Sequence, residues 1–167
     1  ERTDDAIAAL KKATVLEPRL VEAWQNLGWA YMREEKRIAD AIPVFEHAIK
    51  LKPDIPDIWR NLGACYADSG RLSDAIAAYG QAVKLNPADA FSWNALGGCF
   101  VKTGDAEKAM DAFEKAVKAD PGMAEAWYSL GLCYAEKERI EDYIAANEKA
   151  VKIKPDLVMA WNNLGIA

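Results

Sequence analysis

The sequence lacks the features of most enzymes and of membrane proteins. It holds a single histidine, His47, and none of the motifs G-x-x-x-x-G-K-[ST], G-x-S-x-G or H-E-x-x-H, which serve phosphate binding, nucleophilic catalysis and zinc-dependent hydrolysis. No apolar run approaches the roughly 20 residues that cross a bilayer, and no basic and apolar leader opens the chain. We therefore expect a protein that is not an enzyme, has no catalytic residues, binds no cofactor or metal ion and does not insert into membranes.

Blocks of charge of one sign are also missing. The 21 lysines and arginines are interleaved with 26 aspartates and glutamates, which leaves a net charge of −5 and no basic stripe to replace the counterions of a nucleic acid. Apolar residues make up 51% of the chain and charged residues 28%, a balance typical of globular proteins. Nucleic acid is therefore disfavoured as a partner. Because the chain starts at Glu1 rather than at methionine, we expect it to be a fragment of a longer protein.

What the sequence does contain is one motif in several copies. A tryptophan is followed by leucine after three residues, glycine after four and an aromatic residue after seven, as in the stretch WRNLGACY that begins at Trp59. Further copies begin at Trp24, Trp93 and Trp127, and a shorter one at Trp161, so that the period is 34 residues after a first spacing of 35. These positions share one side of a helix, and the glycine lets a neighbouring helix approach closely. A period of this length indicates stacked structural repeats.

A second helical pattern follows each of the first helices. A small residue, an aromatic residue four positions later and an alanine three after that recur at Ala41, Phe45 and Ala48, at Ala75, Tyr79 and Ala82, and at Ala109, Phe113 and Ala116. Each second helix ends near a proline, at Pro53, Pro87, Pro121 or Pro155, because proline cannot continue it. The pattern predicts a half repeat over residues 1–20 that holds only the second helix. Four full repeats follow over residues 21–157, and a half repeat over 158–167 holds only the first helix.

These residues resemble the tetratricopeptide repeat family, whose pattern of Trp, Leu-Gly, Tyr, Ala, Phe and Pro at a 34-residue period matches almost the whole chain. The resemblance implies an all-α fold, an α-α superhelix in which antiparallel helix pairs stack into one continuous right-handed solenoid. In such a solenoid the first helices line a concave groove and the second helices lie outside. Most members of the family bind peptides or protein segments in that groove or serve as assembly scaffolds, and very few are catalytic.

Two of the second helices depart from the pattern. Pro43 falls inside the first of them, and we interpret Asp40 as an N-cap that starts this helix late and leaves Pro43 in its first turn. A functional kink is the alternative interpretation. In the fourth repeat, Tyr143 stands where the others have alanine and Asn147 where they have an aromatic residue. Because a large and a small residue have exchanged places four positions apart, the pattern predicts local repacking rather than a binding role.

The sequence has only three cysteines, and they occupy one slot of successive repeats. Cys65, Cys99 and Cys133 lie 34 residues apart, which invites a metal or disulfide interpretation. Equivalent slots of stacked repeats are separated by roughly two helix-packing distances, however, whereas a disulfide needs Cα atoms within about 7 Å. The first repeat has Ala30 in this slot. We therefore expect free thiols that fill space as small apolar groups, in a reducing and hence cytoplasmic compartment.

Four aromatic residues lie outside the repeat pattern: Trp29, Phe91, Tyr128 and Tyr143. The first three fall on first helices, on the side turned away from the packed positions, and are predicted anchors for a ligand in the groove. The alternative interpretation is that Trp29 and Phe91 pack over each other and over neighbouring side chains.

An asparagine just before Leu-Gly recurs at Asn26, Asn61 and Asn163, with Ala95 and Ser129 interrupting the row. A primary amide both donates and accepts hydrogen bonds, so such a row can hold an extended peptide by its backbone. The row is similar to the asparagine ladder in the tetratricopeptide region of the O-linked N-acetylglucosamine transferases, with two of five rungs missing. The carboxylate clamp of chaperone-binding members, by contrast, needs Lys, Asn and Arg at slots held here by Gln25, Trp29, Phe91 and Ala95. Recognition of an acidic chaperone tail is therefore disfavoured.

The leading prediction is a non-catalytic protein–protein interaction scaffold that binds an extended peptide or partner segment in the groove. The predicted groove residues are Gln25, Asn26, Trp29, Arg33, Arg60, Asn61, Phe91, Asn94, Tyr128 and Asn163. One alternative is a structural array that self-associates end to end, because the two terminal half repeats are complementary. Another is the substrate-recruiting arm of a larger enzyme such as a glycosyltransferase.

Overall fold

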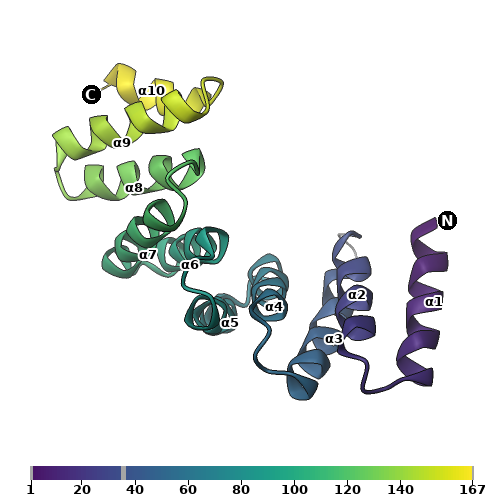
Figure 1. Ribbon diagram of the computed structural model, residues 1–167. Helices are drawn as coiled ribbons and strands as arrows, with labels where there is room; N and C mark the ends of the chain where they lie inside the picture. The colour runs from purple at the N-terminus through teal and green to yellow at the C-terminus, as the bar shows by residue number, and fades with distance from the viewer. Residues whose placement is uncertain (1, 35–36, 167) are drawn as a thin grey trace. The chain divides into compact units, whose positions relative to one another are not determined.

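The computed structural model describes residues 2–34 and 37–166, and every regular element in these residues is a helix (Figure 1). The helices are α1 (Arg2–Leu16), α2 (Val21–Met32), α3 (Ile38–Leu51), α4 (Pro56–Asp68), α5 (Leu72–Leu85), α6 (Ala90–Thr103), α7 (Ala106–Ala119), α8 (Ala124–Glu136), α9 (Ile140–Ile153) and α10 (Val158–Ile166). They divide between two compact units, Glu1–Asn86 and Pro87–Ala167, which we call unit 1 and unit 2. The predicted all-α helical-repeat fold is confirmed.

Within each unit, every helix packs against the next one along the chain. Unit 1 contains α1 to α5, and its pairs α2 with α3 and α4 with α5 make its most extensive contacts. Unit 2 contains α6 to α10, with the corresponding pairs α6 with α7 and α8 with α9. The ribbon turns back after each helix, so neighbouring helices of a unit run antiparallel (Figure 1).

The tryptophan at the fourth position of each first helix ties that helix to the preceding turn. Its indole Nε1–H donates a hydrogen bond to the carbonyl oxygen of the proline six residues earlier, over 2.8 Å from Trp59 to Pro53 and 3.0 Å from Trp93 to Pro87. The same bond joins Trp24 to Pro18, Trp127 to Pro121 and Trp161 to Pro155. These five tryptophans therefore have a structural role, and a bond of this kind contributes roughly 1 kcal/mol to stability.

The glycine four residues after each tryptophan is required by the close approach of the second helix. A Cβ atom built at Gly28 would lie 2.6 Å from the ring of Phe45, and one at Gly97 would lie 2.7 Å from the ring of Phe113. Any larger side chain at these positions would push the two helices of the pair apart. We call these tryptophan, leucine, glycine, aromatic, alanine and proline positions the repeat frame.

The start of α3 corrects one prediction. The helix begins at Ile38, so Asp40 lies in its first turn and is not its N-cap. The Asp40 carboxylate instead accepts a hydrogen bond from Arg37 Nε at 3.2 Å. Pro43 therefore lies beyond the first turn, inside the helix. Because proline has no backbone N–H, the carbonyl of Ala39 lacks its usual helical hydrogen bond. The helix tolerates this because Ala39 and Pro43 are both exposed, so that water can reach the carbonyl.

The exchange of side chains in α9 is local repacking, as predicted. Tyr143 and Asn147 are 6% and 0% exposed, and Asn147 Nδ2 lies 2.8 Å from the position that a Cβ of Gly131 would take. Asn147 thus occupies the place that an aromatic ring holds in the other pairs. The Tyr143 hydroxyl donates to the carbonyl of Asn163 at 3.0 Å, and Asn163 Nδ2 donates to Asn147 Oδ1 at 3.1 Å. The amide of Asn147 and the phenol of Tyr143 are both satisfied by these bonds and by a bond from Asn147 Nδ2 to the Tyr143 carbonyl.

The three cysteines are free and buried. Burial raises the pKa of the Cys65 thiol to about 12, with Asp68 adding to the effect, and raises the pKa of Cys133 to about 11. Burial also raises the pKa of Cys99. Thiols that stay protonated in this way fill space and are poor nucleophiles and poor metal ligands. The described residues contain no group of three or more His, Cys, Asp or Glu side chains that could hold a metal ion.

None of the helices in the described ranges combines the length and the apolar character that a membrane span requires.

Candidate functional site

Trp29 is the one tryptophan of unit 1 that the repeat frame does not use. It lies on α2, five residues after Trp24, and 57% of its surface is exposed. Its indole nitrogen forms no hydrogen bond with the residues that the structure describes, in contrast to the proline-bound indoles of Trp24 and Trp59. Two hollows meet at Trp29, one toward α1 and one toward α4.

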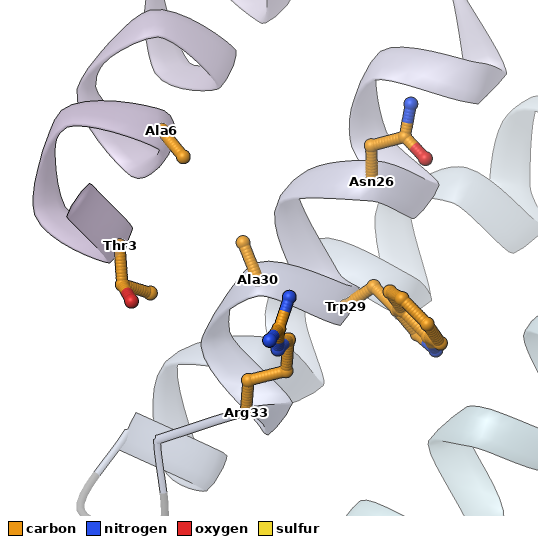
Figure 2. A pocket seen from close by; sticks show the side chains of 6 residues that line it. All are labelled: Thr3, Ala6, Asn26, Trp29, Ala30 and Arg33. Carbon is orange, nitrogen blue, oxygen red and sulfur yellow. The ribbon is translucent and has the colours of Figure 1, made fainter.

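The first hollow lies between α1 and α2. It has a volume of about 380 Å³ and is lined by Thr3, Ala6, Asn26, Trp29, Ala30 and Arg33. Figure 2 shows that Thr3 and Ala6 come from α1, that Arg33 lies next to Ala30 at the end of α2, and that the Trp29 indole extends from the side of α2 away from α1. Arg33 is exposed and forms no ion pair with another described residue. The α1 side of Trp29 therefore offers an apolar floor and one guanidinium that can donate hydrogen bonds to an acidic group.

The second hollow lies between α2 and α4. It has a volume of about 280 Å³ and is lined by Gln25, Asn26, Trp29, Asp57, Arg60 and Asn61. Arg60 forms an ion pair with Asp57 over 2.8 Å, which orients both groups on the α4 wall. The three amides can donate to and accept from a peptide backbone. We call the two hollows together the Trp29 groove.

Six of the ten predicted groove residues line the Trp29 groove: Gln25, Asn26, Trp29, Arg33, Arg60 and Asn61. Trp29 and Phe91 are 57% and 69% exposed, so neither ring is buried by the neighbouring side chains of its own unit.

Three other predicted residues belong to unit 2. Phe91 is exposed in the first turn of α6, whereas Asn94 on α6 and Tyr128 on α8 are half-buried. The Oδ1 atom of Asn94 is buried and has no hydrogen-bond partner among the described residues. The first helices of this unit also expose Leu132 and Val101, which the sequence interpretation missed. Leu132 lies five residues after Trp127, just as Trp29 lies five residues after Trp24, and this shared position could have identified it from the sequence.

The tenth predicted residue, Asn163, is not placed on an open surface. It is only 8% exposed, and its side-chain amide is bound to Asn147 in the contact between α9 and α10. The side-chain exchange in α9 places the polar Asn147 where the other repeats have an aromatic ring. The amide of Asn163 binds this polar group and is therefore turned into the helix contact. Asn163 therefore does not act as a rung for a peptide in this structure.

Sequence interpretation also missed the contribution of α1 to the groove. Thr3 and Ala6 line the hollow beside Trp29, yet the repeat pattern assigns α1 only a packing role. The sequence could have indicated this contribution, because α1 is predicted to be the second helix of a half repeat. A second helix packs against the next first helix, so part of its surface must border that helix's groove side.

Exposed apolar side chains also gather on α10. Val158, Met159, Trp161 and Ile166 are each more than half exposed, as are Val15 and Leu16 near the end of α1. End-to-end self-association stays a prediction, which sedimentation over a series of protein concentrations would test.

Comparisons with known proteins agree with this architecture. The tetratricopeptide repeat model matches residues 1–54, 34–90, 66–124 and 100–158. A crystal structure of MamA is 29% identical, with a TM-score of 0.86 over 92% of this chain and 89% of that one. The crystal structure of YrrB, described as a TPR protein with an unusual peptide-binding site, is 28% identical, with a TM-score of 0.82 over 96% of this chain and 82% of that one.

A further MamA structure, residues 41 to the end from Desulfovibrio magneticus RS-1, is 24% identical with a TM-score of 0.78 over 87% of this chain and 82% of that one, a likeness that shows the fold alone. The comparison with curated proteins gave no match. The fold is one that serves protein–protein interaction scaffolds, and the repeat model covers nearly the whole chain. The chain belongs to the tetratricopeptide repeat family.

Proposed function

We propose that this protein is a non-catalytic interaction module that holds an extended segment of a partner protein in the Trp29 groove. The observation that carries the proposal is the exposed indole of Trp29 between two hollows with polar walls. An aromatic side chain that can be fully covered by a partner is the usual centre of a binding hot spot. An extended peptide that crosses Trp29 would place one side chain on each side of the indole.

The polar walls of the groove favour a peptide over a small apolar ligand. Asn26 borders both hollows, and Gln25 and Asn61 border the hollow next to α4. Their amides match the alternating N–H and C=O groups of an extended backbone, which every peptide sequence presents. Arg33 adds a preference for an acidic side chain on the α1 side of Trp29. The likeness to YrrB, which has a peptide-binding site, supports this class of ligand.

A peptide selection followed by titration tests the proposal. Peptides selected from a random displayed library on the immobilised protein are titrated by calorimetry against the wild type and against Trp29→Ala. We expect Trp29→Ala to weaken binding by about 1–3 kcal/mol, because it removes the anchor, while the helical circular dichroism stays unchanged. Val15→Ala is the matched control, since Val15 is an apolar side chain of unit 1 that is 77% exposed and does not line the groove. Normal binding by Trp29→Ala would refute the proposed anchor.

Phe91→Ala applies the same test to unit 2. The ring is 69% exposed, so its removal leaves no cavity and is not expected to lower stability. For peptides that engage this unit, we expect a loss of about 1–3 kcal/mol in binding free energy. If no selected peptide responds to Phe91→Ala, the exposed ring is not an anchor.

The amides give a separate expectation. Asn61→Ala is expected to lower the affinity of all groove-bound peptides by a similar factor, because its contact is with the backbone that they share. The measurement is a titration of several unrelated selected peptides against this variant. A loss confined to one peptide sequence would indicate that Asn61 recognises a side chain instead.

A further inference from the structure

Two frame tryptophans of unit 2, Trp93 and Trp127, line surface hollows in addition to making their hydrogen bonds to proline. The last turn of α7 lies beside the start of α6, so that Lys115 and Lys118 flank Trp93. The last turn of α9 lies in the same way beside the start of α8, with Lys149 and Lys152 flanking Trp127. Lys115 Nζ is 4.8 Å from the centroid of the Trp93 ring, and Lys149 Nζ is 4.0 Å from that of Trp127. Each ammonium is thus held over an indole face by a cation–π contact.

Each tryptophan and its lysines border a hollow. The hollow beside Trp93 has a volume of about 570 Å³ and is completed by Pro87, Ala88 and Ala119. The hollow beside Trp127 has a volume of about 280 Å³ and is completed by Pro121 and Ile153. We call these two hollows, one repeat apart, the Trp–Lys edge. Each combines an apolar floor with two ammonium groups at its rim.

The positive charge of this edge is largely uncompensated. Lys118, Lys149 and Lys152 are exposed and form no ion pair with another described residue, while Lys115 pairs with Asp111 over 2.6 Å. The chain as a whole carries a net charge of −5, so this concentration of free cations runs against its overall composition. A patch of this kind attracts ligands of negative charge.

The fold itself does not require the lysines that cover the two indoles. The slot of Lys115 and Lys149 is occupied in unit 1 by Gln81 and by His47, whose ring lies 4.1 Å from that of Trp24. The other two lysines have a structural explanation, because Lys118 and Lys152 lie in the last turn of their helices and complement the helix dipole, as Lys50 and Lys84 do in unit 1. Lys115 and Lys149 therefore distinguish unit 2 from unit 1.

We propose that the Trp–Lys edge is a second docking surface, which binds an acidic segment of a partner protein that carries apolar side chains at regular intervals. The apolar side chains of such a segment cover the tryptophan, proline and alanine floor, while its carboxylates pair with the lysines. A nucleic acid fits less well, because its backbone offers phosphates without the interleaved apolar groups and would meet Asp111 and the net negative charge of the chain. This surface belongs to unit 2 and the Trp29 groove to unit 1, and the proposal does not depend on the function proposed for that groove.

The test uses a fluorescein-labelled peptide of repeated Asp-Glu-Phe-Asp-Glu-Leu units and a counterpart with Asn and Gln in place of Asp and Glu. We expect the acidic peptide alone to bind, with an affinity that falls as salt is added. In a 1H–15N spectrum of the labelled protein, binding is expected to move the indole N–H signals of Trp93 and Trp127. The double variant Lys115→Gln/Lys149→Gln, which copies the residue found at Gln81, is expected to lose about tenfold in affinity.

The matched control is Lys102→Gln/Lys137→Gln, which removes the same charge from unit 2 at the opposite ends of α6 and α8. It is expected to retain most of the affinity, as is Trp29→Ala. If both lysine double variants lost the same affinity, net charge alone would explain the binding and the proposal would be wrong. It would also be wrong if the peptide bound without moving the Trp93 and Trp127 signals. Tighter binding of a single-stranded oligonucleotide or of phosphatidylserine vesicles to the same lysines would refute the proposed partner class.

Discussion

Units 1 and 2 share one frame and differ in the residues that the frame leaves free. Both tie their first helices to the preceding turn through an indole bond to proline, and both bring helix pairs together over a glycine. Unit 1 presents Trp29, amides and arginines between its helices, whereas unit 2 presents Phe91 on α6 and lysines over two of its frame tryptophans, Trp93 and Trp127.

This difference separates the residues that make the fold from those that give it a partner. In a repeat array, each frame residue serves the same contact in every repeat, so its presence carries no information about a ligand. A residue that appears in one repeat and is replaced in the next is not needed for the fold, and it can therefore determine which partner binds. If this separation is correct, substitutions of frame residues lower stability, whereas substitutions of the other residues change binding.

The largest expected effect is on the glycines. Gly63→Ala in unit 1 and Gly97→Ala in unit 2 are each expected to lower the free energy of unfolding by about 1–3 kcal/mol, because the new methyl group would meet the rings of Tyr79 and Phe113. Gly98→Ala is the control, since a Cβ there meets nothing within 4 Å. Urea unfolding measures all three. If Gly98→Ala proved as costly as Gly97→Ala, the frame would not be defined by close helix approach.

The buried thiols predict a loss of stability at alkaline pH. The folded-state pKa of Cys65 is raised to about 12 from an ordinary value of 9.0, so the folded protein holds this proton after the unfolded chain has released it. The stability from this group is complete below about pH 9 and is lost as pH rises toward 12, by about 1 kcal/mol per pH unit. Cys65→Ala is expected to flatten the fall measured by urea unfolding between pH 9 and pH 11, whereas parallel curves would contradict the pKa shift.

The two kinds of tryptophan are expected to respond differently to loss of the indole N–H. Trp59→Phe breaks the bond to Pro53 and is expected to cost about 1 kcal/mol in unfolding free energy. Trp29→Phe removes no bond among the described residues and is expected to leave stability unchanged. Thermal unfolding of both variants makes the comparison. An equal cost would mean that Trp29 belongs to the structural frame.

A smaller effect is expected in the turn before α9. The turns before α5 and α7 hold glycines of positive φ, Gly70 at 72° and Gly104 at 80°, but the turn before α9 holds Glu138 at φ 58°. A side chain in this conformation is strained, so Glu138→Gly is expected to raise the free energy of unfolding by about 0.5–1 kcal/mol. Gly104→Ala is the reciprocal test and is expected to lower it. A destabilised Glu138→Gly would show that the glutamate side chain has a compensating contact.

The frame could be predicted from the sequence because its contacts are local or periodic. The tryptophan and its proline are six residues apart, and the leucine and glycine follow the tryptophan on one helix face. The start of α3 could not be predicted in this way. The preference of aspartate for N-caps is only statistical, and here it competes with the ion pair that Asp40 makes with Arg37.

The candidate site was predictable only in part, for reasons of packing. Trp29 and the amides stand out because they interrupt the pattern. The burial of Asn163, in contrast, depends on a hydrogen bond to Asn147, sixteen residues away on another helix. The lining by Thr3 and Ala6 and the lysines over Trp93 and Trp127 likewise depend on how two helices pack side by side, which no single stretch of sequence encodes.

Whether Trp29 is the anchor is tested most directly by following the indole N–H signals of all six tryptophans while a peptide selected for groove binding is titrated into the 15N-labelled protein. Five indoles are bound to proline carbonyls, and that of Trp29 is exposed without such a bond. We expect the Trp29 signal to move with the peptide concentration while those of Trp24 and Trp59 stay in place. A bound peptide that leaves the Trp29 signal unmoved would contradict this expectation.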